Sequence, residues 1–214
     1  MTKLIVFDFD GTLGNTLANI LVTMRRITRQ LGYPDASDEA IKTTIGLPLE
    51  VGIRQLYPQA DDSAVQRATI LYREVFEQTS KEIIPTVFPH VPETLAALAG
   101  QGVVMTVASA REEKSLRQLL QRMGLDAFFP YVLGANNVTR NKPDPEPVLK
   151  TMSELGFSPE DTLVVGDMPV DVLMGKRAGA RACAVTYGNS TRAELLEAGA
   201  DKVIDDFSQL LSIL

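Results

Sequence analysis

The sequence predicts an α/β fold, a doubly wound parallel sheet of Rossmann-like type that carries an inserted α-helical cap subdomain. Short, continuous apolar runs predict strands that are buried on both faces of a parallel sheet. Segments with helical spacing separate most of these runs, which favours right-handed strand–helix–strand connections. The first two apolar runs are instead separated by a long stretch that is predicted to contain only helices. At about 70 residues, that stretch is long enough to form a subdomain.

Five apolar runs are the expected strands of the sheet. They are Leu4–Phe7, Val103–Ala108, Leu163–Val165, Ala182–Val185 and Val203–Ile204. The expected core helices share a helical spacing, and most end close to a glycine, which is common at helix C-termini. They are Pro92–Ala99, Glu112–Met123, Pro145–Leu155, Met168–Ala178 and Arg192–Ala198.

The stretch between the first two strands is expected to form the cap. Its helical segments are Leu17–Leu31, Glu39–Thr44, Leu49–Leu56 and Ala64–Thr79. Glycines before it and prolines after it suggest its limits. We therefore place the cap at residues 15–88 and the α/β core at residues 1–14 and 89–214.

Composition excludes several classes of protein. The chain has 214 residues, of which 45% are hydrophobic and 22% charged, as in ordinary globular proteins. Its net charge of −6, without a basic stripe, argues against a nucleic-acid partner. The single cysteine, Cys183, cannot form an internal disulfide, which fits a reducing compartment. No apolar run approaches the length of a membrane span or a signal-peptide core, so we expect a cytoplasmic protein without a membrane partner.

Polar residues follow the expected strands at the point where each strand ends. Asp8 and Asp10 come directly after the first strand, Ser109 after the second and Asp167 after the third. Ligands of open α/β sheets bind at the carboxyl ends of the strands. We therefore expect these four residues to gather at one edge of the sheet, together with Lys142 from a loop near that edge.

These residue types point to phosphoryl transfer. Carboxylates are hard oxygen ligands of the kind that Mg²⁺ takes, and Lys142 supplies a positive charge for a phosphate. Asp8 can attack phosphorus and become an aspartyl phosphate. Asp10 lies two residues further along an extended backbone, on the same side, and can protonate the leaving group and later deprotonate water. Ser109 adds a hydroxyl, and backbone N–H groups at the following helix start can hold phosphate oxygens.

Four segments at these positions resemble the four motifs of the haloacid dehalogenase-like hydrolase superfamily. They are Asp8–Leu13, Val107–Ser109, Lys142–Pro143 and Gly166–Asp171, in the order of the motifs. The helical insert after the first motif resembles the small α-helical cap of that superfamily. Within the superfamily, the sequence is most similar to the phosphoglycolate phosphatase-like branch.

The resemblance implies a Mg²⁺-dependent phosphatase that hydrolyses a small, phosphoglycolate-like phosphomonoester through an aspartyl phosphate. It makes Asp8 the nucleophile and a metal ligand. Asp10 becomes the acid/base, with its backbone carbonyl on the metal, and Asp167 becomes a further metal ligand. Asp171 and Thr12 are expected to contact these ligands, or to reach the metal through a water molecule, without binding it directly. A monomer or a weak homodimer is expected.

The resemblance assigns the phosphoryl group to Ser109, Ala110 and Lys142. It also suggests residues that contact the rest of the substrate. Arg54 and Arg111 are candidates for binding a substrate carboxylate, although a surface charge is the favoured alternative for each.

The cap and the first two motifs raise further questions of specificity. Gly46 lies in a cap loop that could reach down to the site. Asn15 stands where the family usually has Asp, and Ala110–Arg111 where it often has Asn then Lys. These departures leave the nucleophile unchanged and affect the expected specificity.

Other functions remain open at this point. A phosphomutase acting on a sugar phosphate would use the same motifs but return the phosphoryl group to its substrate. A dehalogenase is disfavoured because it has no need of an acid/base at Asp10. A non-catalytic phospho-accepting module would carry its acceptor on a middle strand and lack a cap. Each motif alone also has a structural explanation, for example Asp167 and Asp171 as helix-capping residues.

Overall fold

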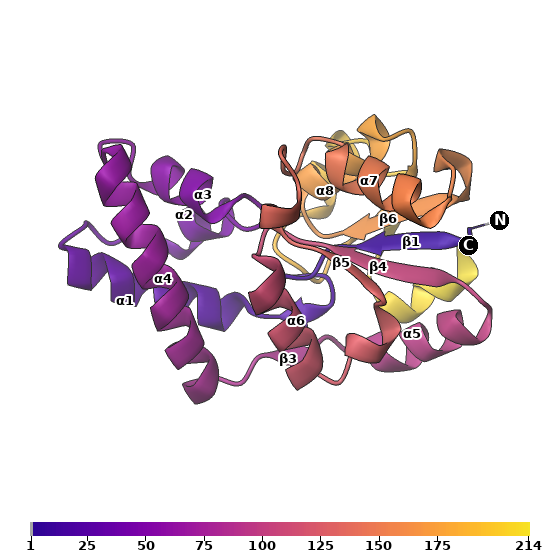
Figure 1. The fold of residues 1–214 in the computed structure, drawn as a ribbon, viewed down its shortest axis with the longest axis horizontal. Helices are drawn as coiled ribbons and strands as arrows, with labels where there is room; N and C mark the ends of the chain where they lie inside the picture. The colour runs from indigo at the N-terminus through magenta and orange to yellow at the C-terminus, as the bar shows by residue number, and fades with distance from the viewer. Residues whose placement is uncertain (1) are drawn as a thin grey trace.

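A six-stranded parallel sheet forms the centre of the core in the computed structural model, which describes residues 2–214 (Figure 1). The order of its strands is β5-β4-β1-β6-β7-β8, so that β1 and β6 are neighbours at the centre. The strands are β1 (Leu4–Phe7), β4 (Val104–Ala108), β5 (Tyr131–Leu133), β6 (Thr162–Gly166), β7 (Arg181–Val185) and β8 (Lys202–Ile204). The expected doubly wound sheet is confirmed.

Helices cover both faces of this sheet, as Figure 1 shows. They are α5 (Val91–Gly100), α6 (Glu113–Arg122), α7 (Glu146–Leu155), α8 (Pro169–Arg177) and α9 (Arg192–Glu197), with short 3₁₀ turns η1 (Asp126–Phe128), η2 (Ala135–Asn137), η3 (Pro159–Asp161) and η4 (Phe207–Ser212). Successive side chains of a strand point to opposite faces. Leu4 and Val6 therefore pack towards α7 and α8, whereas Ile5 and Phe7 pack towards α5 and α6. Burial on both faces explains why β1 is apolar throughout.

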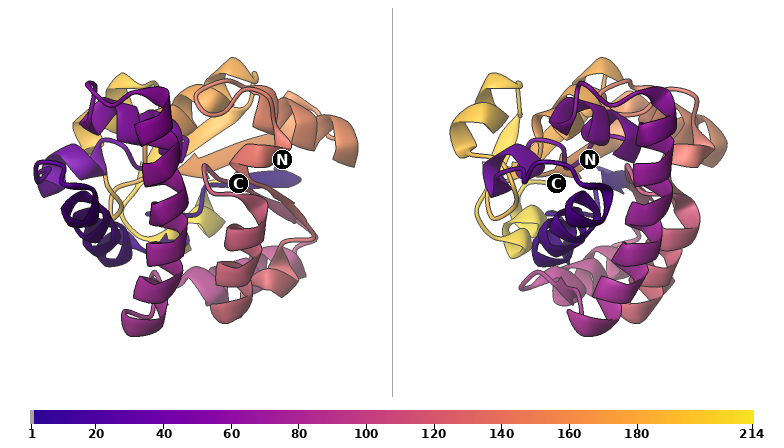
Figure 2. Two further views of the ribbon diagram at one scale, coloured as in Figure 1. Left: turned by 60° about the vertical axis from the view of Figure 1, so that its left-hand side comes forward. Right: turned by 90° about the vertical axis from the view of Figure 1, so that its left-hand side faces the viewer.

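The insert between β1 and β4 is helical, as predicted, and lies against the carboxyl end of the sheet (Figures 1 and 2). It contains α1 (Leu17–Leu31), α2 (Asp38–Lys42), α3 (Leu49–Leu56) and α4 (Asp62–Glu82). The short strands β2 (Gly14–Asn15) and β3 (Thr86–Val87) pair in antiparallel fashion where the chain leaves the core and returns to it. The domain limits at residues 15 and 88 stay a prediction.

The longest helix, α4, has 21 residues and an amphipathic surface. Val65, Tyr72 and Phe76 are buried on one face of this helix, and α4 packs along α1. Within residues 2–214, none of the helices combines the length and the apolar composition needed to cross a membrane.

Three strands were not predicted, for a physical reason. Strand β5 has only three residues at the edge of the sheet, and β2 and β3 have two each. Segments this short show neither an apolar run nor an alternation that can be distinguished from a loop. They form because neighbouring segments offer paired backbone groups, as β4 does for β5.

Asp61 caps the N-terminus of α4, since its carboxylate accepts the backbone N–H of Ala64 at 2.7 Å. We expect Asp61→Ala to lower the free energy of unfolding by about 1 kcal/mol, the usual effect of removing an N-cap side chain. Glu74→Ala, an exposed change in the middle of the same helix, is the control and should have little effect. Urea denaturation of both variants measures the difference, and equal stabilities would contradict the capping role.

Candidate active site

Three buried carboxylates meet at the carboxyl ends of β1 and β6. They belong to Asp8 and Asp167, which follow these strands, and to Asp171 in the first turn of α8. One carboxylate oxygen of each lies within 4.8 Å of the others. Negative charges this close repel one another, and burial adds the cost of removing each from water. The cluster therefore requires cations.

Lys142 provides the first positive charge. Its Nζ lies 2.5 Å from Asp8 Oδ1 and 2.6 Å from Asp171 Oδ1, and only 2% of its side chain is exposed. Burial alone would lower the pKa of Lys142, but the carboxylates of Asp171 and Asp8 more than reverse this and raise it. The ammonium group therefore stays charged at neutral pH. As the sequence predicts, Lys142 joins the residues that follow the strands.

One ammonium does not balance three carboxylates. Burial raises the pKa of Asp8 well above its usual value, and nearby Asp171 and Asp167 add to this against the opposing effect of Lys142. Burial, together with Asp171, raises the pKa of Asp167 to about 7. An all-oxygen donor set that still lacks two positive charges fits Mg²⁺, which prefers carboxylate ligands. The residues that would hold the ion are Asp8, Asp167 and Asp171.

Asp171 thus lies inside the carboxylate cluster. The family resemblance implies that Asp171 supports the ligands, and part of its hydrogen bonding fits that expectation. Its Oδ2 accepts the backbone N–H of Met168 at 3.1 Å, so the side chain also closes the first turn of α8. Its carboxylate lies as close to the cluster as those of Asp8 and Asp167, so Asp171 can also serve as a third ligand, and its supporting role stays a prediction.

Asp167 is held by three hydrogen-bond donors. Thr12 Oγ1 donates to Asp167 Oδ1 at 3.0 Å, and the backbone N–H and Nδ2 of Asn189 both donate to Oδ2 at 2.8 Å. The surrounding backbone is close, because a Cβ on Gly11 or Gly188 would lie within 2.4 Å of this side chain. The predicted supporting position of Thr12 agrees with this geometry. Asn189 was missed, although its place shortly after the strand ending at Val185 was the available signal.

The carboxylate of Asp10 points away from the other three acids and towards the cap. Arg111 binds it through two parallel hydrogen bonds, Nε to Oδ2 at 2.6 Å and Nη2 to Oδ1 at 2.7 Å. Thr16 Oγ1 donates to the same Oδ1 at 2.5 Å. Asp10 therefore sits between the cluster and the cap, where an acid/base for a leaving group is needed. The expected contact of its backbone carbonyl with the metal stays a prediction.

The predicted phosphate-binding residues of the second motif also lie at this edge. Ser109 is buried at the end of β4, and its Oγ accepts the backbone N–H of Arg111 at 3.2 Å. Ala110 follows it and lines a cavity between core and cap. Their contact with a phosphoryl group stays a prediction.

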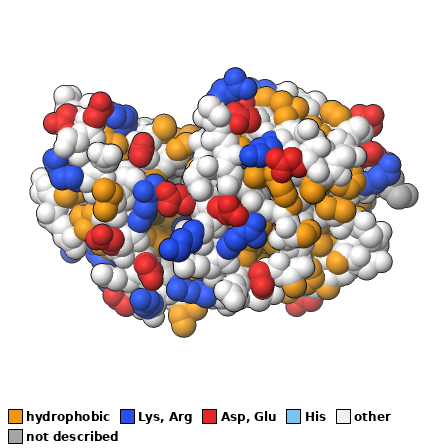
Figure 3. Space-filling model, in the orientation of Figure 1, with side chains coloured by type: hydrophobic (Ala, Val, Ile, Leu, Met, Phe, Trp, Pro, Cys, Tyr) orange, Lys and Arg blue, Asp and Glu red, His pale blue; other side chains and the backbone are white. Residues whose placement is uncertain are grey.

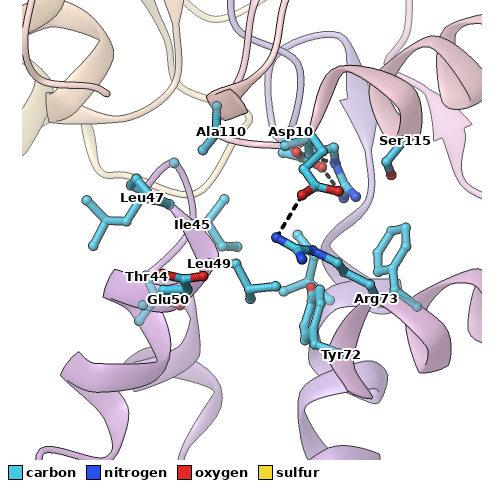
Figure 4. A pocket seen from close by; sticks show the side chains of 18 of the residues that line it. Asp10, Thr44, Ile45, Leu47, Leu49, Glu50, Tyr72, Arg73, Ala110 and Ser115 are labelled. Carbon is cyan, nitrogen blue, oxygen red and sulfur yellow. Dashed lines mark hydrogen bonds and ion pairs between the residues drawn. The ribbon is translucent and has the colours of Figure 1, made fainter. Parts of the chain in front are cut away.

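This cavity has a volume of about 590 Å³. Figure 4 shows Asp10 and Ala110 on its core side, with Ile45 and Leu49 facing Tyr72 across its cap side. The specificity candidate Arg111 also lines it.

The other two specificity candidates differ in position. Gly46 lines the cavity and has a φ of 86°, a conformation that suits glycine. Arg54 is not among the lining residues. Its guanidinium pairs with Asp62 at 2.5 Å, with both side chains exposed, which fits the alternative of a surface charge.

The raised pKa of Asp167 predicts that Mg²⁺ binding depends on pH. Without metal, Asp167 keeps its proton up to about pH 7, and the ion must displace that proton. We expect the Mg²⁺ affinity to fall about tenfold per unit as pH drops below 7, and to level off above it. Calorimetric titration from pH 5.5 to 8 measures this dependence.

Asn189→Ala provides the matched variant. Losing the Nδ2 donor makes the Asp167 carboxylate harder to ionise. The pH at which the Mg²⁺ affinity levels off should therefore be higher in this variant. A Mg²⁺ affinity that does not vary between pH 5.5 and 8 would contradict the assignment of Asp167 as a ligand.

Comparison with known proteins identifies the family of this chain. Residues 5–185 match the family model of haloacid dehalogenase-like hydrolases. The chain is 39% identical over 213 residues to a Dickeya dadantii protein named "Probable phosphatase IndB", covering 99% of this chain and 93% of the relative. It is 31% identical to a phosphoglycolate phosphatase of Haemophilus influenzae, covering 99% and 98%.

A solved structure shows the same architecture. A predicted phosphoglycolate phosphatase from Haemophilus somnus superposes with a TM-score of 0.86 at 28% identity, covering 99% of this chain and 97% of that one. Family match, relatives and fold agree with the resemblance seen in the four motifs. The chain therefore belongs to the haloacid dehalogenase-like hydrolase family, as an enzyme of its phosphatase type.

Proposed function

We propose that this protein is a Mg²⁺-dependent phosphatase that hydrolyses a small phosphomonoester through an aspartyl phosphate on Asp8. The observation that carries the proposal is the buried cluster in which Asp8 shares the Lys142 ammonium with Asp171 and lies close to Asp167. Such a cluster pairs a nucleophile with groups that bind charge. When bound by Asp8, Asp167 and Asp171, Mg²⁺ supplies positive charge that offsets the negative charge of the phosphoryl oxygens.

In the first step, a carboxylate oxygen of Asp8 attacks phosphorus and forms a new O–P bond. The bond between phosphorus and the alcohol oxygen breaks, and Asp10 gives its proton to that oxygen. Asp10 is suited to this role because its carboxylate faces the cavity, on the side where the alcohol would depart. Lys142 and Ser109 bind oxygens of the transferring group.

In the second step, Asp10, now deprotonated, takes a proton from a water molecule. The water oxygen bonds to phosphorus, and the bond between phosphorus and Asp8 breaks, which restores both carboxyl groups and releases inorganic phosphate. The cap limits access of water during the first step. A group bound at the same place as the water, such as a sugar hydroxyl, would instead make the enzyme a mutase.

Relatives suggest where the search for a substrate should start. Relatives from Pseudomonas putida and Haemophilus influenzae, 30% and 31% identical to this chain, are named phosphoglycolate phosphatases. A phosphoglycolate-like phosphomonoester is therefore the first class to test.

The test is release of inorganic phosphate from 2-phosphoglycolate, pyrophosphate, sugar phosphates and simple alkyl phosphates, in Mg²⁺ and in EDTA. We expect release that depends on Mg²⁺ and is stopped by EDTA. Analysis of the products from the sugar phosphates separates hydrolysis from transfer to a second hydroxyl. Isomerised sugar phosphate without free phosphate would replace the phosphatase by a mutase.

A further inference from the structure

The cavity lies beside the expected acid/base and does not include the nucleophile. Asp10, Ala110 and Arg111 line it, whereas Asp8 and Lys142 do not. A substrate with its phosphoryl group at Asp8 would therefore place its alcohol part in this cavity. A volume of about 590 Å³ is in the range that holds a drug-sized ligand, far more than the two-carbon acid of phosphoglycolate requires.

The cap already contacts the core on both sides of the cavity. On one side, Gly46 lies so close to Val170 that a Cβ would meet its Cγ2 at 3.1 Å. On the other side, Arg73 of α4 forms an ion pair with Glu112 at 2.9 Å, drawn as a dashed line in Figure 4. The cavity therefore lies between a core and a cap that contact each other. Its volume does not come from a separation of the two.

Arg111 adds a further contact between core and cap on the side of the Arg73–Glu112 ion pair. Its Cζ lies 4.3 Å from the ring centroid of Phe76, a cation–π distance, while its guanidinium holds Asp10. Core, acid/base and cap are thus joined through one side chain.

The walls of the cavity combine apolar side chains with polar and charged ones, among them Thr44, Glu77 and Ser115. The apolar side chains that line it include Ile20, Met24, Ile45, Leu49, Tyr72 and Phe76. The rings of Tyr72 and Phe76 are stacked, with centroids 5.9 Å apart and planes 19° apart. Branched aliphatic and aromatic side chains around a space of this size suit a ring better than a short polar chain, because aromatic groups gain most from such burial.

The charges around the cavity argue against a second anion on the substrate. Arg111 is engaged by Asp10, and Arg73 by Glu112. The other basic residues that line the cavity within residues 2–214 are Lys114 and Arg122, both exposed at its rim. Figure 3 shows Lys and Arg mixed with Asp and Glu over this face of the molecule. A carboxylate deep in the cavity would have to displace Asp10 from Arg111 to find a cation.

We infer that the preferred substrate is a phosphomonoester of an uncharged alcohol that carries a ring-sized apolar group. This inference rests on the proposed function, since it concerns the alcohol part of the same substrate. It differs from the phosphoglycolate-like class suggested by the relatives, because phosphoglycolate carries a second anion, its carboxylate.

The experiment compares kcat/KM in Mg²⁺ for benzyl phosphate, methyl phosphate and 2-phosphoglycolate. We expect kcat/KM for benzyl phosphate to exceed the other two by about tenfold or more, since each well-buried apolar group contributes at least that factor to specificity. Equal values, or a preference for 2-phosphoglycolate, would overturn the inference and leave the proposed phosphatase intact. Release from a sugar phosphate or pyrophosphate but from none of these three would overturn the inference alone, and release from no compound of either panel would overturn both.

Two variants connect the preference to the cavity. Leu49→Trp fills part of it, and we expect the ratio of kcat/KM for benzyl phosphate to that for methyl phosphate to fall at least tenfold. Ile70→Trp is the matched control, because Ile70 is 52% exposed on α4 and does not line the cavity. A ratio that stays the same in Leu49→Trp, or falls equally in both, would contradict the inference.

Binding without turnover gives a second readout. In the Asp8→Asn background, calorimetry should show tighter binding of benzyl phosphate than of 2-phosphoglycolate, and Leu49→Trp should remove the difference. Tighter binding of 2-phosphoglycolate would overturn the inference even if turnover were lost for another reason.

Discussion

Asp8→Asn is expected to reduce kcat by roughly 10⁴-fold or more, the loss typical when a nucleophile is removed. The amide nitrogen and the less basic amide oxygen cannot form the aspartyl phosphate. Folding should be retained, because Lys142 keeps its contact with Asp171 at 2.6 Å and the variant removes a buried carboxylate whose pKa is already raised. Steady-state phosphate release and circular dichroism measure the two properties.

The control for this variant is Asp126→Asn, an exposed change in η1. It makes the same chemical replacement far from the carboxylate cluster and should leave kcat unchanged. Full activity in Asp8→Asn, after contaminating phosphatases have been excluded, would show that Asp8 is not the nucleophile.

Lys142→Ala is expected to lower the free energy of unfolding by about 3–5 kcal/mol at pH 7 in the absence of Mg²⁺. Removing one member of a buried ion pair leaves the others buried without compensation, which is the costly case. The lysine is 2% exposed and contacts both Asp8 and Asp171, so the two carboxylates lose their only ammonium partner among the described residues. Urea denaturation measures the loss, and the same variant should bind phosphate esters weakly.

Lys176→Ala is the matched control, since Lys176 pairs with Asp201 at 2.5 Å while both side chains are well exposed. Such surface pairs contribute only about 0–1 kcal/mol. Added Mg²⁺ should restore part of the stability of Lys142→Ala, because the ion replaces some of the missing positive charge. Equal losses in the two variants would contradict the role of Lys142 in balancing the cluster.

Much of the fold could be predicted because the strands are buried on both faces. Strands β1, β6 and β7 read as unbroken apolar runs, and the helices between them end at glycines. The same topology explains why Asp8, Asp167 and Lys142, far apart in sequence, could be expected at one edge. Strand β5 could not be predicted, since three residues at a sheet edge form a strand only through pairing with β4.

The site was predictable in its residue types but not in its pairings. Nothing in the sequence specifies that Arg111 holds Asp10, or that Asp171 enters the carboxylate cluster through Lys142. These contacts depend on how β4, α8 and the loop before α7 meet in space. The same applies to Arg54, a candidate for substrate binding that forms an exposed ion pair with Asp62.

The central claim is that a phosphoryl group resides on Asp8 during turnover, and trapping it is the most direct test. The enzyme is mixed with Mg²⁺ and its best phosphate ester, quenched, and treated with borohydride, which reduces an aspartyl phosphate to homoserine. Mass spectrometry of the peptide that contains Asp8 and Asp10 should then show homoserine at position 8 in the wild-type enzyme and not in Asp8→Asn. Unmodified Asp8 in an enzyme quenched during rapid turnover, or the modification at Asp10 instead, would contradict the mechanism.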